Sequence, residues 1–247
     1  PLAVQPPLRV LLVVSGPSDL AVLDTGSEMT NLQTALAALL ERGLVKLDIL
    51  PEPSLSALRR ALRTSTYHVL HFIGHGGYDE VNGDGVIAFE DENGRSHKVS
   101  GGDLGTMLHD ARTMQLAVLN ACEGARTSGR DAFSGVGQAL ARQGLPAVVA
   151  MQTEISDRAA LVFSHEFYWF LTRGLGIDAA ICEVRKAMAV SDEASEWGTA
   201  VLLRSGADQP FSFTASAADA ADRPESRLES LYDAAQGAIK ANTPTMA

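Results

Sequence analysis

Short, almost uninterrupted apolar runs recur along this chain, and they constrain its fold more than any other feature. The clearest are Arg9–Ser15, Val45–Leu50, Tyr67–Ile73, Gln115–Leu119 and Pro146–Met151. Runs of this length and composition are typical of strands buried on both faces of a parallel sheet. Amphipathic helical patterns separate them, at Thr30–Glu41, Ser54–Leu62, Gly102–His109, Phe133–Arg142, Asp157–Leu171 and Asp178–Ala189. We therefore expect an α/β sandwich with a mostly parallel central sheet.

One segment departs from this alternation and predicts a β-hairpin insert. Val86–Glu90 and Ser96–Val99 read as short strands, and the Asn93-Gly94 pair between them is a strong hairpin-turn signal. Further along, Trp197–Arg204 is the last clear strand. The hairpin is inserted into the α/β pattern without replacing it.

The end of the chain has a different composition. Ala215–Glu225 is rich in Ala, Asp and Ser and reads as a linker, and Ser226–Lys240 predicts a weakly amphipathic helix. We expect one domain over residues 1–214, then a linker and helical tail over residues 215–247 that can lead to another module. Because residue 1 is Pro, we also expect a chain that was trimmed, processed or cut from something larger.

Composition excludes several classes of partner. The 247 residues carry a net charge of −10 and no basic block, which disfavours nucleic acid and anionic membrane. Two cysteines provide no disulfide framework, which suits a reducing compartment. No signal peptide is visible at residues 1–7, and no apolar stretch is long enough to span a membrane. These features predict a cytoplasmic location.

Two motifs carry candidate chemistry, and each follows a predicted buried strand. The first contains His75-Gly76-Gly77, and the second is Asn120-Ala121-Cys122-Glu123-Gly124. In open α/β sheets, ligands and reacting groups gather at the carboxyl ends of the strands. A His at one strand end and a Cys at a neighbouring one can form a nucleophile–base pair.

These motifs, in this order and spacing, resemble the CHAT family of caspase-like and separase-like cysteine peptidases. The resemblance runs from about Arg9 to Phe213. It implies a caspase-like three-layer sandwich, a protein substrate, no cofactor, and control by a partner or an attached repeat or sensor domain, in bacterial defence or signalling. By position, it implies that His75 is the general base and Cys122 the nucleophile. The oxyanion hole would be the backbone N–H groups of Gly76 and Cys122.

The residue types suit that chemistry. A free thiol has a pKa of about 8.5, so it needs a nearby imidazole to take its proton or to stabilise the thiolate. Acyl transfer also needs N–H donors where the oxyanion develops, and one such donor is worth about 3–4 kcal/mol. Gly76 and Gly77 allow the backbone to approach a substrate closely.

Other interpretations of the Cys and His residues stay open. A free Cys is often a small buried hydrophobe, and this reading competes with catalysis at Cys122. Cys182 lies on a helical pattern beside Ile181 and is expected in the core. His71, His75 and Cys122 could suggest zinc, but no fourth ligand and no zinc-peptidase signature accompany them, so we expect no metal. His71 is expected to pack in or beside its strand.

Substrate preference depends on three candidate positions. Relatives that cleave after Arg or Lys carry an Asp two positions before the Cys, where this chain has Asn120. A second candidate for an acidic residue in the substrate pocket lies in the Glu154–Asp157 turn. This turn resembles the separase segment that carries an acidic pocket residue. Asp157 is the closest match, although an acid in the first turn of a helix is also favourable for the helix dipole.

The leading functional prediction is an endopeptidase with a Cys122–His75 dyad. The main alternative is a catalytically silent caspase-like scaffold, because fold does not fix function. A nucleotide-binding domain ranks last, because no phosphate loop or Gly-x-Gly-x-x-Gly fingerprint follows the first strand.

Overall fold

The computed structural model describes residues 2–79, 81–126, 132–153, 155–190, 194–206 and 211–214. Within these ranges, the side chains of residues 121–126, 132, 134 and 211 are not described. The predicted tail over residues 215–247 lies outside the described part of the chain, as does Glu154.

An eight-stranded sheet forms the centre of the molecule. Its main path has the order β3-β2-β4-β7-β8-β9, and β4 continues into a hairpin through β5 and β6. The strands are β2 (Leu8–Ser15), β3 (Val45–Ile49), β4 (Val69–Asp79), β5 (Asp84–Glu90), β6 (Ser96–Ser100), β7 (Leu116–Arg126), β8 (Ala147–Met151) and β9 (Ala200–Arg204). Pairing is parallel from β3 to β8, and antiparallel at β9 and in the hairpin. The expected α/β fold with a mostly parallel sheet and a hairpin insert is confirmed.

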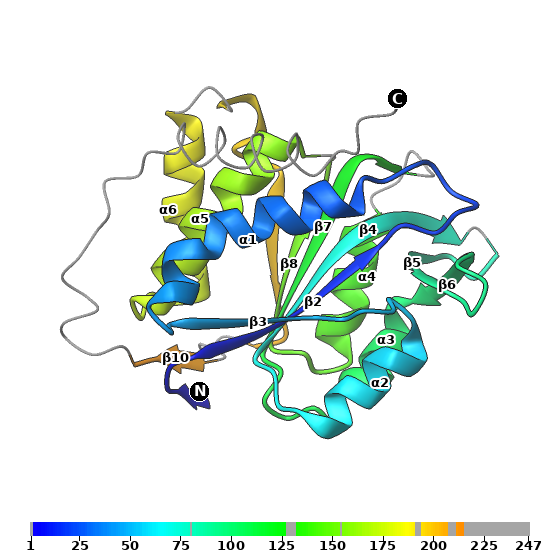
Figure 1. Ribbon diagram of the computed structural model, residues 1–247, viewed down its shortest axis with the longest axis horizontal. Helices are drawn as coiled ribbons and strands as arrows, with labels where there is room; N and C mark the ends of the chain where they lie inside the picture. The colour runs from blue at the N-terminus through cyan, green and yellow to red at the C-terminus, as the bar shows by residue number, and fades with distance from the viewer. Residues whose placement is uncertain are drawn as a thin grey trace, which may run out of the picture.

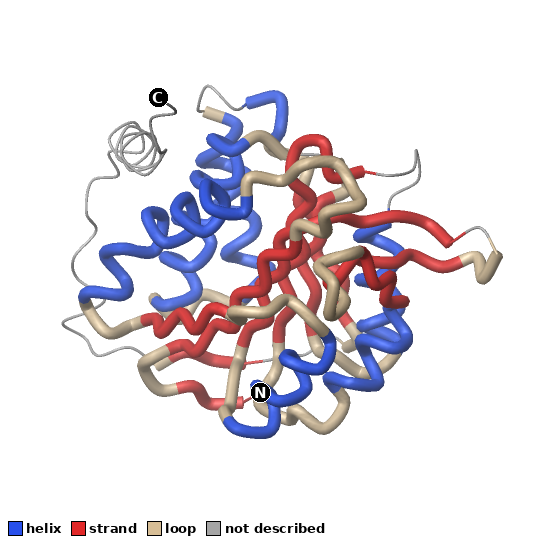
Figure 2. Tube along the Cα trace, turned by 45° about the vertical axis from the view of Figure 1, so that its right-hand side comes forward, coloured by secondary structure: helices blue, strands red, loops and turns tan. Residues whose placement is uncertain are grey.

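Helices cover both faces of this sheet. Figure 1 shows α1, α5 and α6 on one side and α2, α3 and α4 on the other, with the strands between them. Their bounds are α1 (Thr25–Glu41), α2 (Leu55–Thr64), α3 (Gly101–Leu108), α4 (Ala132–Arg142), α5 (Asp157–Thr172) and α6 (Ile177–Ala189). The tube in Figure 2 shows the same three layers from a second direction. The central strands are therefore buried on both faces, as their apolar runs predict.

Local sequence accounts for how several helices begin. Ser54, Ser100 and Ser156 each accept a hydrogen bond from the backbone N–H three residues on, and Asp24 does the same for α1. Side-chain oxygens at this position satisfy N–H groups that have no partner within the helix.

Two strand boundaries differ from the sequence expectation. The strand expected to stop at Ile73 runs on to Asp79, because Gly76 and Gly77 pair with Ile87 and Val86 of β5. The strand expected to stop at Leu119 likewise continues within β7. Pairing with β5 keeps the Gly-rich segment extended, although its composition is that of a turn.

A small second sheet was not expected from the sequence. Strand β1 (Leu2–Val4) pairs in parallel with β10 (Phe211–Phe213). Val4 and Phe213 are both buried in the main core. This pairing ties the two ends of the described chain together.

Candidate active site

The two motifs lie on neighbouring strands in the middle of the sheet. Strands β4 and β7 pair in parallel, with Ile73 beside Asn120 and Gly74 beside Ala121. The register shifts immediately afterwards, so that Gly76 pairs with Arg126. His75 and Cys122 each come one residue after the Gly74–Ala121 pair. The backbones that carry the candidate base and nucleophile are therefore adjacent in the sheet.

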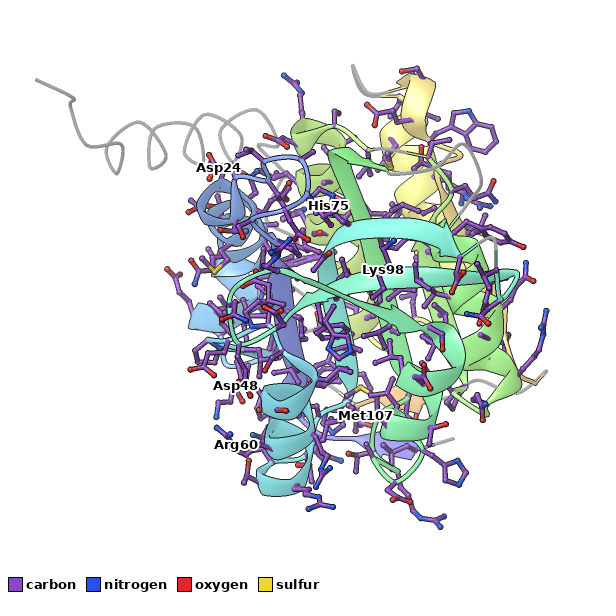
Figure 3. The ribbon with its side chains drawn as sticks, turned by 90° about the vertical axis from the view of Figure 1, so that its right-hand side faces the viewer. Asp24, Asp48, Arg60, His75, Lys98 and Met107 are labelled. Atoms are coloured by element: carbon purple, nitrogen blue, oxygen red, sulfur yellow. The ribbon has the colours of Figure 1, made fainter. Side chains whose placement is uncertain are left out.

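The imidazole of His75 is buried and oriented by a neighbouring loop. His75 is 1% exposed, and its Nε2 lies 2.9 Å from the carbonyl oxygen of Ala21. Ala21 belongs to the loop of residues 16–24 that joins β2 to α1. Figure 3 shows His75 at the same end of the molecule as Asp24, which ends that loop, and far from Arg60 and Met107.

This hydrogen bond determines the tautomer of His75. A backbone carbonyl oxygen can only accept a hydrogen bond, so Nε2 carries the proton and donates it to Ala21. In the neutral ring, the basic lone pair is then on Nδ1. His75 can accept a proton at Nδ1 while the loop holds Nε2.

Gly76 is packed where no larger residue fits. A β-carbon on Gly76 would collide with the ring of Phe133, a residue of α4. Phe133 is itself buried and packs at 6.5 Å, ring centre to ring centre, from Phe72 of β4. The Gly at this position is therefore required by packing whether or not its N–H serves an oxyanion.

The structure describes the backbone of Cys122 and both the backbone and the side chain of the nearby candidate Asn120. The backbone of Cys122 belongs to β7, but its side chain lies outside the described residues. Asn120 is 4% exposed, and its Oδ1 has no hydrogen-bond partner within the described part of the chain. Asn120 thus offers a buried acceptor two residues before Cys122.

Asp157 and Asp24 begin two helices that pack against each other, α5 and α1. Hydrogen bonds from Ser27 lower the pKa of Asp24, so that residue stays ionised. Partial loss of hydration and then the negative charge of Asp24 raise the pKa of Asp157, although Asp157 is an exposed residue. The two carboxylates create a local negative potential at the start of α5, and Asp24 was not among the residues singled out from the sequence.

Comparison with known families identifies the domain. The family model described as the CHAT domain matches residues 2–226. The chain belongs to the CHAT-domain family. The expected resemblance to the CHAT family is confirmed.

The fold of the CHAT domain is also found in solved structures. It matches a secreted C11 cysteine protease from Bacteroides thetaiotaomicron, solved with an irreversible peptide inhibitor, with a TM-score of 0.52 and 12% identity. That match covers 81% of this chain and 66% of the protease chain. A second match is the Saccharomyces cerevisiae separase–securin complex, with a TM-score of 0.43, 13% identity and coverage of 82% of this chain and 12% of that chain. No curated protein matches the sequence.

His71, which lies four residues before His75 on β4, is a core residue of the CHAT domain. His71 is 1% exposed, its Nδ1 lies 2.9 Å from the hydroxyl of Tyr168, and the two rings stack. Burial lowers the pKa of His71 to about 3, so the ring is neutral at physiological pH. The expectation that His71 packs in its strand is confirmed. Among the described side chains, no group of three or more His, Cys, Asp or Glu residues could hold a metal ion.

The prediction that Cys182 lies in the core is wrong. Cys182 is an exposed free thiol on α6. The buried positions of this helix are Ile177, Ala180, Ile181, Val184 and Met188. Because successive helical residues are about 100° apart, Cys182 next to Ile181 lies off that stripe.

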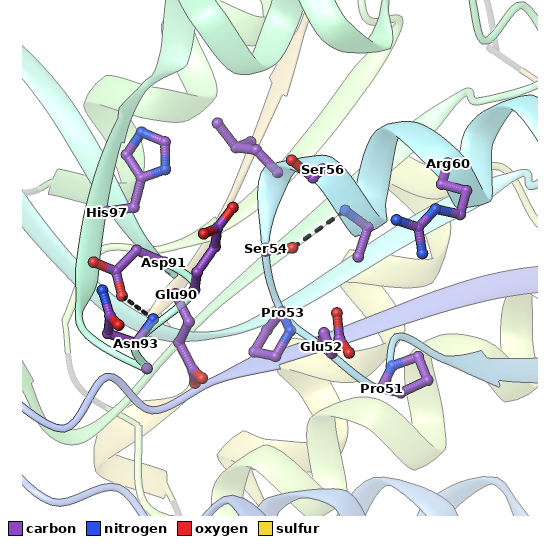
Figure 4. Close-up of a pocket in the computed structure, with 14 residues that line it drawn as sticks. Pro51, Glu52, Pro53, Ser54, Ser56, Arg60, Glu90, Asp91, Asn93 and His97 are labelled. Atoms are coloured by element: carbon purple, nitrogen blue, oxygen red, sulfur yellow. Dashed lines mark hydrogen bonds between the residues drawn. The ribbon is translucent and has the colours of Figure 1, made fainter.

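A cavity of about 850 Å³ lies away from His75, between the start of α2 and the turn of the β5–β6 hairpin. Figure 4 shows its polar lining, which includes Glu52, Arg60, Asp91 and His97. It mixes acidic and basic groups and contains none of the candidate catalytic residues.

None of the helices in the described ranges has the length and apolar composition of a membrane-spanning segment.

Proposed function

We propose that this CHAT domain is a cysteine endopeptidase in which Cys122 is the nucleophile and His75 the general base. The observation that carries the proposal is the parallel pairing of β4 with β7, in which His75 and Cys122 each follow the paired residues Gly74 and Ala121. The hydrogen bond from His75 to Ala21 supports it, because that bond leaves Nδ1 as the basic nitrogen.

The proposed reaction follows from these two groups. The Cys122 thiol passes its proton to His75, and sulfur attacks the carbonyl carbon of the scissile peptide bond. The tetrahedral intermediate collapses to a thioester as the leaving amine takes the proton back from His75. Water then attacks the thioester with His75 as base, which releases the acid and restores the thiol. The bond to Ala21 keeps Nε2 occupied, so that the same nitrogen, Nδ1, handles each proton.

The oxyanion would be stabilised by backbone donors. We assign this role to the N–H groups of Gly76 and Cys122, as the family resemblance implies. Each such donor contributes about 3–4 kcal/mol to stabilisation of the transition state.

The preferred substrate would carry a cationic side chain next to the scissile bond. Asp157 and Asp24 support this preference through the negative potential at the start of α5. Asn120 would add a hydrogen-bond acceptor without a charge, since its Oδ1 is buried and has no partner among the described residues. Glu154 belongs to the same proposed acidic segment, but lies outside the described residues.

Regulation by a partner or fused module is part of the same proposal. His75 is 1% exposed, so an incoming peptide and the ring can meet only after local rearrangement. We propose that residues 1–214 form the peptidase domain, that residues 215–247 lead to a regulatory module, and that the protein acts in the cytoplasm.

The test is cleavage of a diverse peptide library by two samples. One is this chain alone, and the other is the full assembly, in which the chain is joined to its proposed regulatory partner or module. Wild type and the control Cys182→Ala should both cleave, with preference for Lys or Arg before the bond. Cys122→Ala and His75→Gln should each reduce turnover by about 10³-fold or more. Wild-type turnover in Cys122→Ala protein would overturn the assignment. Loss of selectivity in Asp157→Asn with unchanged kcat would identify Asp157 as a specificity residue.

A catalytically silent scaffold is the second candidate, and the burial of His75 favours it. A peptidase and a scaffold differ in the reactivity of Cys122 toward a thiol-directed electrophile. A scaffold would show no acceleration at Cys122 under any condition, including in the full assembly.

A further inference from the structure

The loop that holds His75 is itself held by the β5–β6 hairpin. Figure 1 shows this loop, residues 16–24, running from the end of β2 toward β5 and β6 before the chain turns back into α1. The backbone N–H and the hydroxyl of Ser18 donate to the carbonyl oxygen of Gly94, at 2.8 and 2.9 Å. Gly16 donates its N–H to Glu90 Oε1 at 3.0 Å. The hairpin therefore contacts the loop at its start and again before Ala21.

Asp19 makes the most specific of these contacts. Its Oδ1 accepts the backbone N–H of Ser96 at 2.6 Å, and its Oδ2 accepts the Ser96 hydroxyl at 2.9 Å. Arg95 lies 4.0 Å from the same carboxylate. The hydrogen bond from the Ser96 backbone lowers the pKa of Asp19, with a smaller contribution from Arg95, so the carboxylate is ionised at neutral pH. Two hydrogen bonds to one carboxylate fix the direction of the side chain as well as its distance.

Only one residue separates this contact from the one that orients His75. Asp19 is bonded to the hairpin, and Ala21 accepts the Nε2 proton of His75 at 2.9 Å. Leu20, between them, donates its N–H to Pro17 in a turn, which limits the freedom of the loop. The position of the Ala21 carbonyl is therefore coupled to the bond between Asp19 and Ser96.

We infer that Asp19 is a positioning residue for His75, and that it acts through the loop by fixing the Ala21 carbonyl against Nε2. This inference rests on the proposed function of His75 as the base. In the proposed reaction, Asp19 touches neither substrate nor the reacting atoms. Its effect is to keep the ring in one tautomer and one orientation, so that Nδ1 faces the thiol proton during each cycle.

The discriminating variants are Asp19→Ala, Asp19→Asn and Ser96→Ala. Asp19→Ala removes both hydrogen bonds, whereas Asp19→Asn keeps one oxygen that can accept the Ser96 N–H. Ser96→Ala removes only the hydroxyl contact and is the mildest change. Asp79→Ala is the matched control, because Asp79 is also an Asp bonded by backbone N–H groups, those of Val81 and Asn82, but its bonds stay within its own turn.

The first readout does not require proteolysis. Nitrogen-15 NMR of the imidazoles reports the tautomer and hydrogen bond of each histidine, and His75→Gln identifies the His75 signals. Wild type and Asp79→Ala should show His75 protonated at Nε2, and Asp19→Ala should show a shifted mixture of tautomers. Asp19→Asn should lie closer to wild type. Unchanged His75 signals in both Asp19→Ala and Ser96→Ala would overturn the inference.

The second readout is the kinetics of peptide cleavage in the active assembly. Asp19→Ala should lower kcat by about tenfold with less than about a twofold change in KM, because misorientation of a base affects the transition state more than binding. Partial recovery in Asp19→Asn should follow. If wild type proves inactive, the proposed function fails while the NMR result still decides the role of Asp19. If wild type is active and Asp19→Ala keeps its kcat, the positioning role is wrong and the peptidase proposal stands.

Discussion

The ring of Phe133 in α4 packs directly against the backbone of Gly76 in β4. It occupies the space that a β-carbon on Gly76 would need. Phe133 is 2% exposed and also packs near Phe72, so it has little freedom to move away. The contact joins the strand that carries His75 to the helix that follows the Cys122 segment. Packing around the proposed oxyanion donor is therefore part of the protein core.

Gly76→Ala should therefore destabilise the fold. We expect a loss of about 1–3 kcal/mol in the free energy of unfolding, as for other overpacked cores. Gly102→Ala is the control, since Gly102 lies in the first turn of α3 and its nearest neighbour to a new β-carbon is 3.7 Å away. Denaturant unfolding of both variants, and of Gly76→Ala combined with Phe133→Leu, tests the explanation. A double variant no more stable than Gly76→Ala would contradict it.

The buried pair of His71 and Tyr168 predicts a pH dependence of stability. His71 stays neutral in the folded protein down to about pH 3, whereas an unfolded His takes up a proton near pH 6.5. Between these values the unfolded state binds more protons, so stability should fall as the pH falls, by up to about 1.4 kcal/mol per pH unit from this residue. The measurement is the free energy of unfolding at several pH values from 7 to 4.

The matched variant for this test replaces both partners, His71→Phe with Tyr168→Phe. Removing both members of a buried hydrogen-bonded pair avoids leaving one polar group unsatisfied. The double variant should lose less stability than wild type over the same pH range. Parallel curves for the two proteins would show that His71 does not titrate as proposed.

Asp157→Asn should stabilise the protein at neutral pH. The pKa of Asp157 is raised, so the folded state holds its proton to a higher pH than the unfolded state does. The ionised carboxylate of Asp157 therefore destabilises the folded state. This destabilisation is complete above the raised pKa and is absent below the ordinary pKa near 3.8. Because Asp157 is solvent-exposed, we expect a gain of only a few tenths of a kcal/mol. Melting temperatures of both proteins at pH 7 and near pH 3.5 should differ at the higher pH and converge at the lower one.

Added salt provides a check on the cause. Screening should reduce the part of the Asp157 effect that comes from Asp24. An advantage of Asp157→Asn that grows with salt would contradict the proposed repulsion.

The elements of the sheet were predictable because each buried strand is a local run of apolar residues. Arg9–Ser15 and Pro146–Met151 correspond closely to β2 and β8. The extension of β4 to Asp79 was not predictable, because Gly74–Gly77 has the composition of a turn and becomes strand only through pairing with β5. Local propensity is a weak guide wherever a distant segment completes the structure.

In the candidate site too, local sequence predicted some features, and others depend on distant segments of the chain. His75 was predicted from its motif, but Ala21 and Asp19 belong to no motif. The proposed role of Asp19 depends on its contacts with Ser96, 77 residues further along the chain. Cys182 was misplaced because the buried stripe of α6 includes Ile181, and the next residue lies about 100° further round the helix, on the exposed side. A sequence pattern can indicate a candidate reactive residue, whereas the groups that contact that residue are known only when the fold is known.

The two cysteines predict a reactivity test that separates a peptidase from a scaffold. Cys182 is exposed on α6 and should react with a thiol-directed electrophile at the rate of an ordinary free thiol. Cys122, if paired with His75, should react at least about tenfold faster in the active assembly, because the imidazole increases its thiolate fraction. Mass spectrometry after short labelling distinguishes the two sites, and Cys182→Ala isolates Cys122. His75→Gln should remove the acceleration at Cys122 and leave the rate at Cys182 unchanged. Equal Cys122 rates in wild type and His75→Gln would show that the two residues do not form a dyad.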